Sequence, residues 1–280
     1  MSTKMFALFR YQIIPVTTQF NLMYDINDVI RRKNEEFFEK LCFFAKRSDF
    51  KGKTIYNFNI DRRDDMMALL TVQRRKNVKI INEDKFEEIV DSFPYITVFI
   101  DNTPEHQILA VETSKDYTSP KSIAKYFNEK INGLLADSHL AVKISPLYKK
   151  SDFWSFIEEH KDKISRINFE LITPNMSNIS HSLSEELKSL SKSTKSSLTN
   201  LNICAERGKS LVIDQQNQGI ASMVDYSSDG GGEISVRVRD SKVKFKSNDY
   251  QASVEIGEAD MKLSLKDIAS LIRSMHEDGR

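Results

Sequence analysis

The sequence has little of several features that would point to a compartment or a chemistry. Only two cysteines occur in 280 residues, too few for a framework of disulfides, which favours a reducing compartment. No apolar run approaches the roughly 18 residues that a membrane-spanning helix needs. Residues 1–16 lack an apolar segment followed by a small-residue cleavage site, so we expect no signal peptide. These absences predict a cytoplasmic protein without membrane insertion.

Motifs for catalysis and cofactor binding are also missing. The sequence has no Walker-type phosphate loop, and its glycine-rich stretch DGGGE (229–233) leads into a strand rather than a helix. We interpret these glycines as a structural turn. The five histidines are scattered singly, without the spacing of a zinc site. We therefore predict no cofactor, no bound metal and no catalytic residue, with one nuclease alternative described below.

The charges nearly cancel, because 41 lysines and arginines face 40 acidic residues and the net charge is +1. No long-range field draws such a chain to a polyanion, so any anion-binding surface must be a local patch. With 40% hydrophobic residues the composition is that of a globular protein. A length of 280 residues is enough for one large domain or two ordinary ones.

Hydrophobic periodicity and turn residues predict interspersed helices and strands. The order indicates an α+β fold of two lobes, each a mixed or antiparallel sheet packed with helices. We place the division at Lys149, giving a domain of residues 1–148 and a domain of residues 149–280 that contains a cationic hairpin. Strands are expected at 5–14, 53–60, 67–73, 78–81, 93–101, 106–114, 140–148, 166–174, 201–206, 233–246 and 252–256. Helices are expected at 27–47, at 120–134 after the cap Ser119, over Phe86, Ile89 and Val90 after the cap Asn82, from Ser151, at 181–198, after the cap Asp214, and from Ser264.

The stretch EISVRVRDSKVKFKSND (233–249) reads as a hairpin with one apolar and one cationic face. If Asp240 and Ser241 form a two-residue turn, Val236 lies opposite Phe245 and Arg237 lies opposite Lys244. Like charges directly opposite one another destabilise a strand pair, so such a ribbon needs an explanation. One explanation is a solvated edge that deters aggregation. The other is a surface that meets a polyanion.

Two sets of cations are candidates for contacts to nucleic-acid phosphates. Side chains two apart on a strand are roughly 6.6–7 Å apart, close to the phosphate spacing of one nucleic-acid strand. The second set lies on the serine-rich helix, at i, i+4 and i+7 on one face. The predicted nucleic-acid-binding residues are Arg237, Arg239, Lys242, Lys244 and Lys246 on the hairpin, and Lys188, Lys192 and Lys195 on the helix.

Two alternatives remain. In the first, the cationic ribbon or a strand edge docks on an acidic protein, and the chain is an interaction subunit that regulates a partner effector. In the second, Asp101, Glu112 and Lys115 form a metal-dependent nuclease site, which requires their side chains to converge on one cation. The spacing weakens this hypothesis, because two residues separate Glu112 from Lys115 where such sites usually have one.

Four stretches carry a resemblance to a known family. They are SFPYITVFID, ILAVETSKDYTSPKSIAKYFNEKIN, ISRINFELITPNMSNISHSLSEEL and DGGGEISVRVRDSKVKFKSNDYQASVEI. They contain a Phe-Pro entry strand, a Ser-Pro helix, a strand ending in Pro-Asn and a late Gly-Glu hairpin with an Arg-Asp turn. Over about residues 50–257 their order and spacing resemble a bacterial family known as a domain of unknown function.

The resemblance implies a context rather than a chemistry, because the family has no agreed active site. Similar genes lie near bacterial antiphage systems. The size and alternating layout also resemble the Rex-type phage-exclusion and Kiwa-type defence proteins, for which DNA binding is the family expectation. We therefore expect a non-catalytic homo-oligomer that binds DNA with little sequence preference in an antiviral setting, with a protein effector as a further partner.

Overall fold

The run MFALFRYQII forms most of β1 (Thr3–Pro15), the strand on which the larger of two main sheets is built. One edge of β1 pairs with β7, and the other edge pairs first with β13 and then with β8. Burial on both faces explains the nearly continuous apolar sequence of the strand. The computed structural model describes residues 2–16, 26–47, 56–81, 83, 85–115, 117–172, 185–194, 196 and 198–278.

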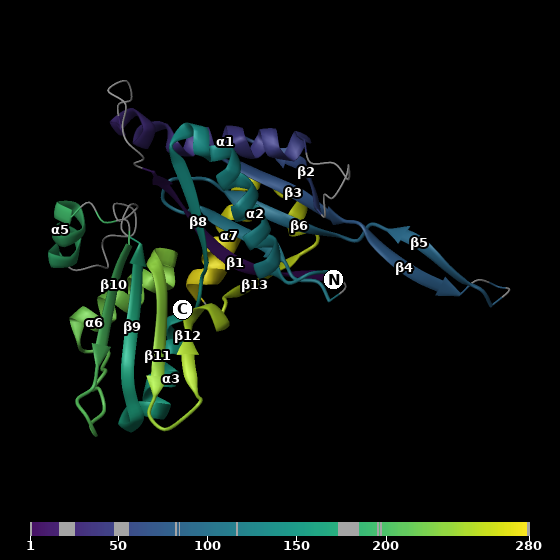
Figure 1. Ribbon diagram of the computed structural model, residues 1–280. Helices are drawn as coiled ribbons and strands as arrows, with labels where there is room; N and C mark the ends of the chain where they lie inside the picture. The colour runs from purple at the N-terminus through teal and green to yellow at the C-terminus, as the bar shows by residue number, and fades with distance from the viewer. Residues whose placement is uncertain are drawn as a thin grey trace.

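The larger sheet contains seven strands within the described ranges, and every pair in it is antiparallel. Their order is β13-β1-β7-β6-β3-β2, with β8 beside β1 (Figure 1). The expected pairing of the strands at 93–101 and 106–114 is confirmed. The bounds are β2 (Tyr56–Arg63), β3 (Met67–Arg74), β6 (Tyr95–Asp101), β7 (Ile108–Glu112), β8 (Leu140–Pro146) and β13 (Ser253–Gly257).

Helices cover both faces of this sheet. On one face α1 (Ile26–Arg47) and α2 (Pro120–Leu135) bury apolar side chains against the odd-numbered residues of β1. On the other face α7 (Leu265–Asp278) packs on a second cluster that includes Phe6 and Leu8. The start of α2 is as predicted, since the Ser119 hydroxyl accepts a hydrogen bond from a backbone N–H of the first turn.

The smaller sheet has the strand order β10-β9-β11-β12 and is also antiparallel. Two helices pack on its inner face and bury a separate apolar cluster. Its outer face carries mainly polar side chains. The bounds are α3 (Lys150–His160), β9 (Ile164–Ile172), β10 (Leu198–Cys204), α6 (Gln218–Tyr226), β11 (Gly232–Val238) and β12 (Lys244–Lys246), with α5 (Glu185–Thr194) preceding β10. The predicted α+β class, with antiparallel sheets and packed helices, is confirmed.

One predicted helix is wrong. The segment expected to form a helix over Phe86, Ile89 and Val90 is instead the strand β5 (Glu87–Ser92), paired with β4 (Lys76–Ile81). The spacing of these apolar residues also fits one face of a helix. The segment is too short for hydrophobic periodicity to distinguish a helix from a strand. Asn82, the expected cap, lies outside the described residues.

Two helix starts differ from prediction. The N-cap of α3 is Lys149 rather than Ser151, and no side chain caps that end. The N-cap of α6 is Asn217, whereas Asp214 accepts a backbone hydrogen bond in the preceding turn. The described residues also contain short turns, namely η1 (Ala136–Ser138), η2 (Lys161–Lys163), the π-type turn η4 (Ser227–Gly231), η5 (Ser247–Asp249) and η6 (Asp260–Lys262).

The glycine-rich turn joins the two sheets, in the structural role expected from the sequence. Arg10 and Gln12 of β1 donate hydrogen bonds to the carbonyl oxygens of Asp229 and Gly230, at 3.1 and 2.7 Å. Gly230 has φ +81°, and a Cβ there would lie 2.4 Å from the Cβ of Arg10. Glycine is therefore required both by the backbone conformation and by the close approach of β1.

The chain passes from the larger to the smaller sheet and then returns. The predicted division near Lys149 falls between β8 and α3, where the chain enters the smaller sheet. However, β13 pairs with β1 and α7 packs on the larger sheet, so the last part of the predicted second domain belongs with the first. Whether residues 1–148 and 149–280 are separate folding units stays a prediction.

Candidate nucleic-acid interface

The register of the cationic hairpin is as predicted from its alternation. Val236 lies opposite Phe245, and Arg237 lies opposite Lys244. Val236 and Phe245 are fully buried against α3, which fixes the other face of the hairpin toward solvent. Arg237, Lys244 and Lys246 are exposed on that outer face.

The pairing of β9 with β11 adds a cation that sequence reasoning missed. Arg166 lies directly opposite Arg237, on the side away from Lys244. Because neighbouring strands are about 4.8 Å apart, the three residues form one row roughly 10 Å long across the sheet. We call Arg166, Arg237 and Lys244 the cationic row. The alternation of β9 places Arg166 on a polar face, but only the strand pairing brings it beside the hairpin.

The described part of the chain supplies no ion-pair partner for the cationic row. Among the described residues, no carboxylate lies within 4.0 Å of any nitrogen in the three side chains. The carboxylates on the same face, Glu170 and Glu233, are four residues further along their strands, about 13 Å away at 3.3 Å per residue. Glu170 is itself paired with Lys143 at 2.7 Å. Arg237 therefore has a like charge directly opposite on each side, which is unfavourable without a counter-anion.

The second row of the outer face supplies three neutral hydrogen-bonding groups and one lysine. It consists of Asn202, Asn168, Ser235 and Lys246, one from each strand. The third row begins with Asn200 and then carries the two glutamates. On the described strands of this face, no outward residue is aromatic. The face can bind phosphate oxygens, but it offers no ring on which a base could stack.

The remaining hairpin cations do not join the row. Arg239 turns away, and its guanidinium donates to the carbonyl oxygen of Gly208 at 2.8 Å. Lys242 is exposed in the connection between β11 and β12. The predicted two-residue turn at Asp240 and Ser241 is wrong, because the strands end earlier and residues 239–243 connect them. The backbone N–H of Arg239 bonds to Lys163 and that of Val243 to the Ser241 hydroxyl, so neither extends the ladder.

The helical set of cations is separate from the hairpin. Lys188 of α5 pairs with Glu185 at 2.7 Å, and its side chain is mostly buried. α5 leads into β10, whereas the hairpin ends at β12, so the two sets lie at opposite edges of the smaller sheet (Figure 1). The side chain of Lys192 and the whole of Lys195 lie outside the described residues.

A small cleft continues the outer face toward the larger sheet. Lys121 of α2 donates to the carbonyl oxygen of Asn248, just beyond β12. A hollow of about 260 Å³ there is lined by Lys121, Lys125 and Glu233, and a second of about 220 Å³ reaches Lys246. The two exposed lysines of α2 extend the positive surface, and no local pattern indicated that α2 meets the hairpin.

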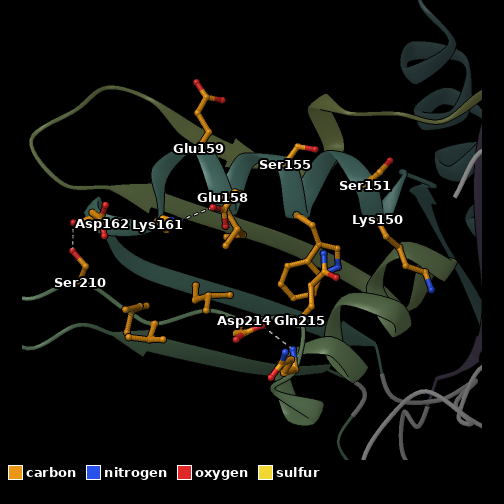
Figure 2. Close-up of a pocket in the computed structure, with 16 residues that line it drawn as sticks. Lys150, Ser151, Ser155, Glu158, Glu159, Lys161, Asp162, Ser210, Asp214 and Gln215 are labelled. Atoms are coloured by element: carbon orange, nitrogen blue, oxygen red, sulfur yellow. Dashed lines mark hydrogen bonds and ion pairs between the residues drawn. The ribbon is translucent and has the colours of Figure 1, made fainter.

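The opposite side of the smaller sheet has the opposite charge. A groove of about 1300 Å³ runs between α3 and the segment 210–216, with Trp154 in its wall (Figure 2). Four carboxylates line it, and its two lysines are already paired, Lys150 with Asp225 at 2.8 Å and Lys161 with Glu158 at 2.6 Å. A polyanion is repelled from this groove, so the outer face is the anion-accessible side.

The nuclease geometry is not present. Asp101 lies opposite Ile108, at the other end of the β6–β7 pair from Glu112. The Asp101 carboxylate binds Arg273 and Thr103, while that of Glu112 binds Lys4 and a backbone N–H of β6. The two carboxylates do not converge on one cation. No group of three His, Cys, Asp or Glu residues suited to a metal occurs within the part of the chain that the structure describes.

Comparisons with known proteins leave the family open. A scan against protein-family models found no match, and a search of curated proteins found no significant match. The resemblance of the four motifs to a defence-associated family therefore stays a hypothesis. In the described chain, no helix is both long enough and apolar enough to span a membrane.

Proposed function

We propose that this chain binds DNA through the phosphate backbone, with the outer face of the smaller sheet as the contact surface and without catalysing a reaction. The observation that carries the proposal is the cationic row: Arg166, Arg237 and Lys244 lie side by side, exposed, with no carboxylate of the described chain in ion-pair distance. Successive phosphates would neutralise the row and remove its internal repulsion.

The chemistry of the face favours the backbone over the bases. Asparagine amides, a serine hydroxyl and Lys246 stand beside the row and can donate to phosphate oxygens. Since the described face has no aromatic side chain, single strands gain no stacking energy from it. We expect little sequence preference, and a duplex bound at least as tightly as a single strand of the same length.

The affinity should be that of a modest electrostatic contact. Each phosphate neutralised contributes about −0.9 to the slope of log affinity against log salt for duplex DNA, so three to four contacts give a slope of about −3 to −4. Such contacts correspond to a Kd of about 10⁻⁴ to 10⁻⁶ M at physiological salt. Fluorescence anisotropy of a labelled duplex, titrated at several salt concentrations, measures both quantities.

The decisive variant reverses the row, as Arg166→Glu, Arg237→Glu and Lys244→Glu. The matched control reverses three exposed lysines elsewhere, as Lys161→Glu, Lys262→Glu and Lys266→Glu, and gives the same net charge. We expect the row variant to lose at least about tenfold in affinity and most of its salt slope, with the control close to wild type. Unchanged affinity in a row variant with a normal melting curve would rule out this surface.

The same cations would suit an acidic protein, which is the alternative function. A pull-down repeated after nuclease treatment separates the two. A protein partner stays bound to the wild-type chain and is lost from the row variant, whereas a DNA-mediated association disappears with the DNA. The antiviral setting rests on the resemblance of the four motifs, and plating of phage on bacteria that express the wild-type chain or the row variant tests it.

A further inference from the structure

A two-stranded ribbon extends from the larger sheet into solvent (Figure 1). Its strands, β4 and β5, continue β3 and β6, and the backbone N–H of Arg74 still bonds to the carbonyl oxygen of Pro94 at the point where the ribbon leaves the sheet. Inside the sheet, β2 and β7 cover the outer edges of β3 and β6. Beyond that point β4 and β5 pair only with each other among the described strands. We call residues 75–92 the arm.

The arm carries apolar side chains without a core beneath them. Ile81 is 73% exposed and Ile89 is 64% exposed, and the two lie on the same face because their strands pair Ile81 with Glu87 and Lys79 with Ile89. Phe86 in the adjoining turn is 70% exposed. The other face is less open, since Val78 and Val90 are paired and half-buried and Ile80 is 41% exposed.

A ribbon of this kind needs something to pack against. An isolated two-stranded hairpin is at best marginally stable in water, and a free apolar edge invites association. The body of the protein, as far as the structure describes it, does not supply that surface. The exposed isoleucines therefore indicate an intermolecular contact.

The charges of the arm identify the occupant. On the face with Ile81 and Ile89, the β4 side is basic, with Lys79 and, just before the strand, Arg75, and the β5 side is acidic, with Glu87 and Asp91. These charges pair within the arm, Lys79 with Glu87 at 2.9 Å and Arg75 with Asp91 at 2.7 Å. This face thus carries both signs in equal number, and the whole arm is close to neutral, with four basic and five acidic residues, which fits neither a polyanion nor a strongly charged partner.

We propose that the arm docks on the arm of a second copy of this chain, face to face through Ile81 and Ile89. A two-fold axis parallel to the strands lays the basic strand of each arm over the acidic strand of the other. Symmetric edge pairing would instead place β4 against β4 or β5 against β5, with like charges together. The face-to-face arrangement buries the isoleucines of both copies and links their ion pairs.

The test uses the full chain in light scattering coupled to size exclusion, at up to about 100 μM, well above the Kd of a specific dimer. Wild type should elute at twice the chain mass. The double variant Ile81→Ser and Ile89→Ser should be monomeric, while the matched control Ile80→Ser on the other face stays dimeric. The arm lies outside the cores, so circular dichroism of the variants should remain that of wild type.

Charge reversal tests the orientation. A variant whose Ile81 face is acidic on both strands, made with Arg75→Glu and Lys79→Glu, should be monomeric. A variant whose same face is basic on both strands, made with Glu87→Lys and Asp91→Lys, should be monomeric too. An equimolar mixture of the two should form a heterodimer. A monomeric wild type overturns the proposal, and so does a dimer that survives loss of Ile81 and Ile89. Failure of the mixture to associate overturns the charge-paired orientation.

Discussion

Gly230 lies where β1 and the turn before β11 come together, and its lack of a side chain allows that contact. A Cβ there would meet the Cβ of Arg10 at 2.4 Å, and the φ of +81° disfavours any other residue. The backbone of this turn also accepts hydrogen bonds from Arg10 and Gln12. The two sheets can therefore approach this closely only because residue 230 has no Cβ.

Alanine substitution at two glycines should have opposite effects on stability. Gly230→Ala should lower the free energy of unfolding by about 1–3 kcal/mol or more, through strain and displacement of Arg10. Gly133→Ala, inside α2, should raise it by up to about 1 kcal/mol, because the added Cβ would meet no atom within 4 Å beyond the adjoining backbone of the helix. Urea unfolding of both variants measures the difference. Similar effects at the two sites would contradict the close contact at Gly230.

His106 links stability to pH. Burial lowers the pKa of its imidazole below the usual 6.5, and Arg273 and Arg10 lower it further against the opposing effect of Asp101 and Glu105. The neutral form is thus favoured in the folded state, and the unfolded chain takes up a proton at higher pH. The contribution of neutral His106 to the free energy of unfolding is complete above pH 6.5. It is lost as the pH falls through the lowered pKa of the folded state.

The corresponding variant is His106→Asn. Wild type should lose more of its free energy of unfolding than the variant does between about pH 7.5 and about pH 5.5. Urea titrations at the two pH values measure the losses. Equal losses in the two proteins would show that His106 does not contribute to this pH dependence.

At the scale of elements, the ion pair between Asp101 and Arg273 attaches α7 to β6. The Asp101 side chain is 1% exposed, and Arg273 donates to it at 3.1 Å. Arg273→Met should lower the free energy of unfolding by about 1–3 kcal/mol, because it leaves a buried carboxylate with Thr103 as its remaining side-chain partner. Adding Asp101→Asn should recover part of this loss. A double-mutant cycle by urea unfolding measures the coupling, and additive losses would contradict it.

Elements were predictable where local pattern and tertiary environment agree. The alternation of residues 233–246 gave the register of Val236 against Phe245, and Ser119 with Pro120 gave the start of α2. The first strand of the arm was predicted, but β5 was mistaken for a helix, because its apolar residues are mostly exposed and mark neither a core-facing helix nor a half-buried strand. Arg166 was missed because its neighbour Arg237 is 71 residues away in the sequence. The local pattern of each strand does not indicate which distant strand it pairs with.

At the scale of the whole molecule, positive, negative and balanced charge occupy three different regions. The outer face of the smaller sheet presents the cationic row, the groove beside α3 is lined by carboxylates, and the arm pairs its own charges. A net charge of +1 conceals this separation. If two copies associate through their arms, as proposed, each dimer presents two cationic rows, and binding to a long duplex gains from the high local concentration of the second row.

The return of the chain to the larger sheet was not predictable, since β1 and β13 are about 250 residues apart and nothing local links them. The structure makes its consequence clear. β13 completes an edge of β1, and α7 covers Phe6 and Leu8, so residues 1–148 alone lack one layer of their core. Loss of that layer exposes a large apolar surface.

The fragment of residues 1–148 should therefore not fold alone, and a short connection should rescue it. Tyr148 forms a β-bridge with Gln251, and the backbone N–H of Ala252 bonds to the carbonyl oxygen of Leu147. A glycine-serine linker can join residue 148 to residue 250 and omit the smaller sheet. Circular dichroism and thermal melting should show a cooperative transition for the fusion and none for residues 1–148. A cooperatively folded 1–148 fragment would instead support the boundary expected from the sequence, with β13 and α7 as accessories.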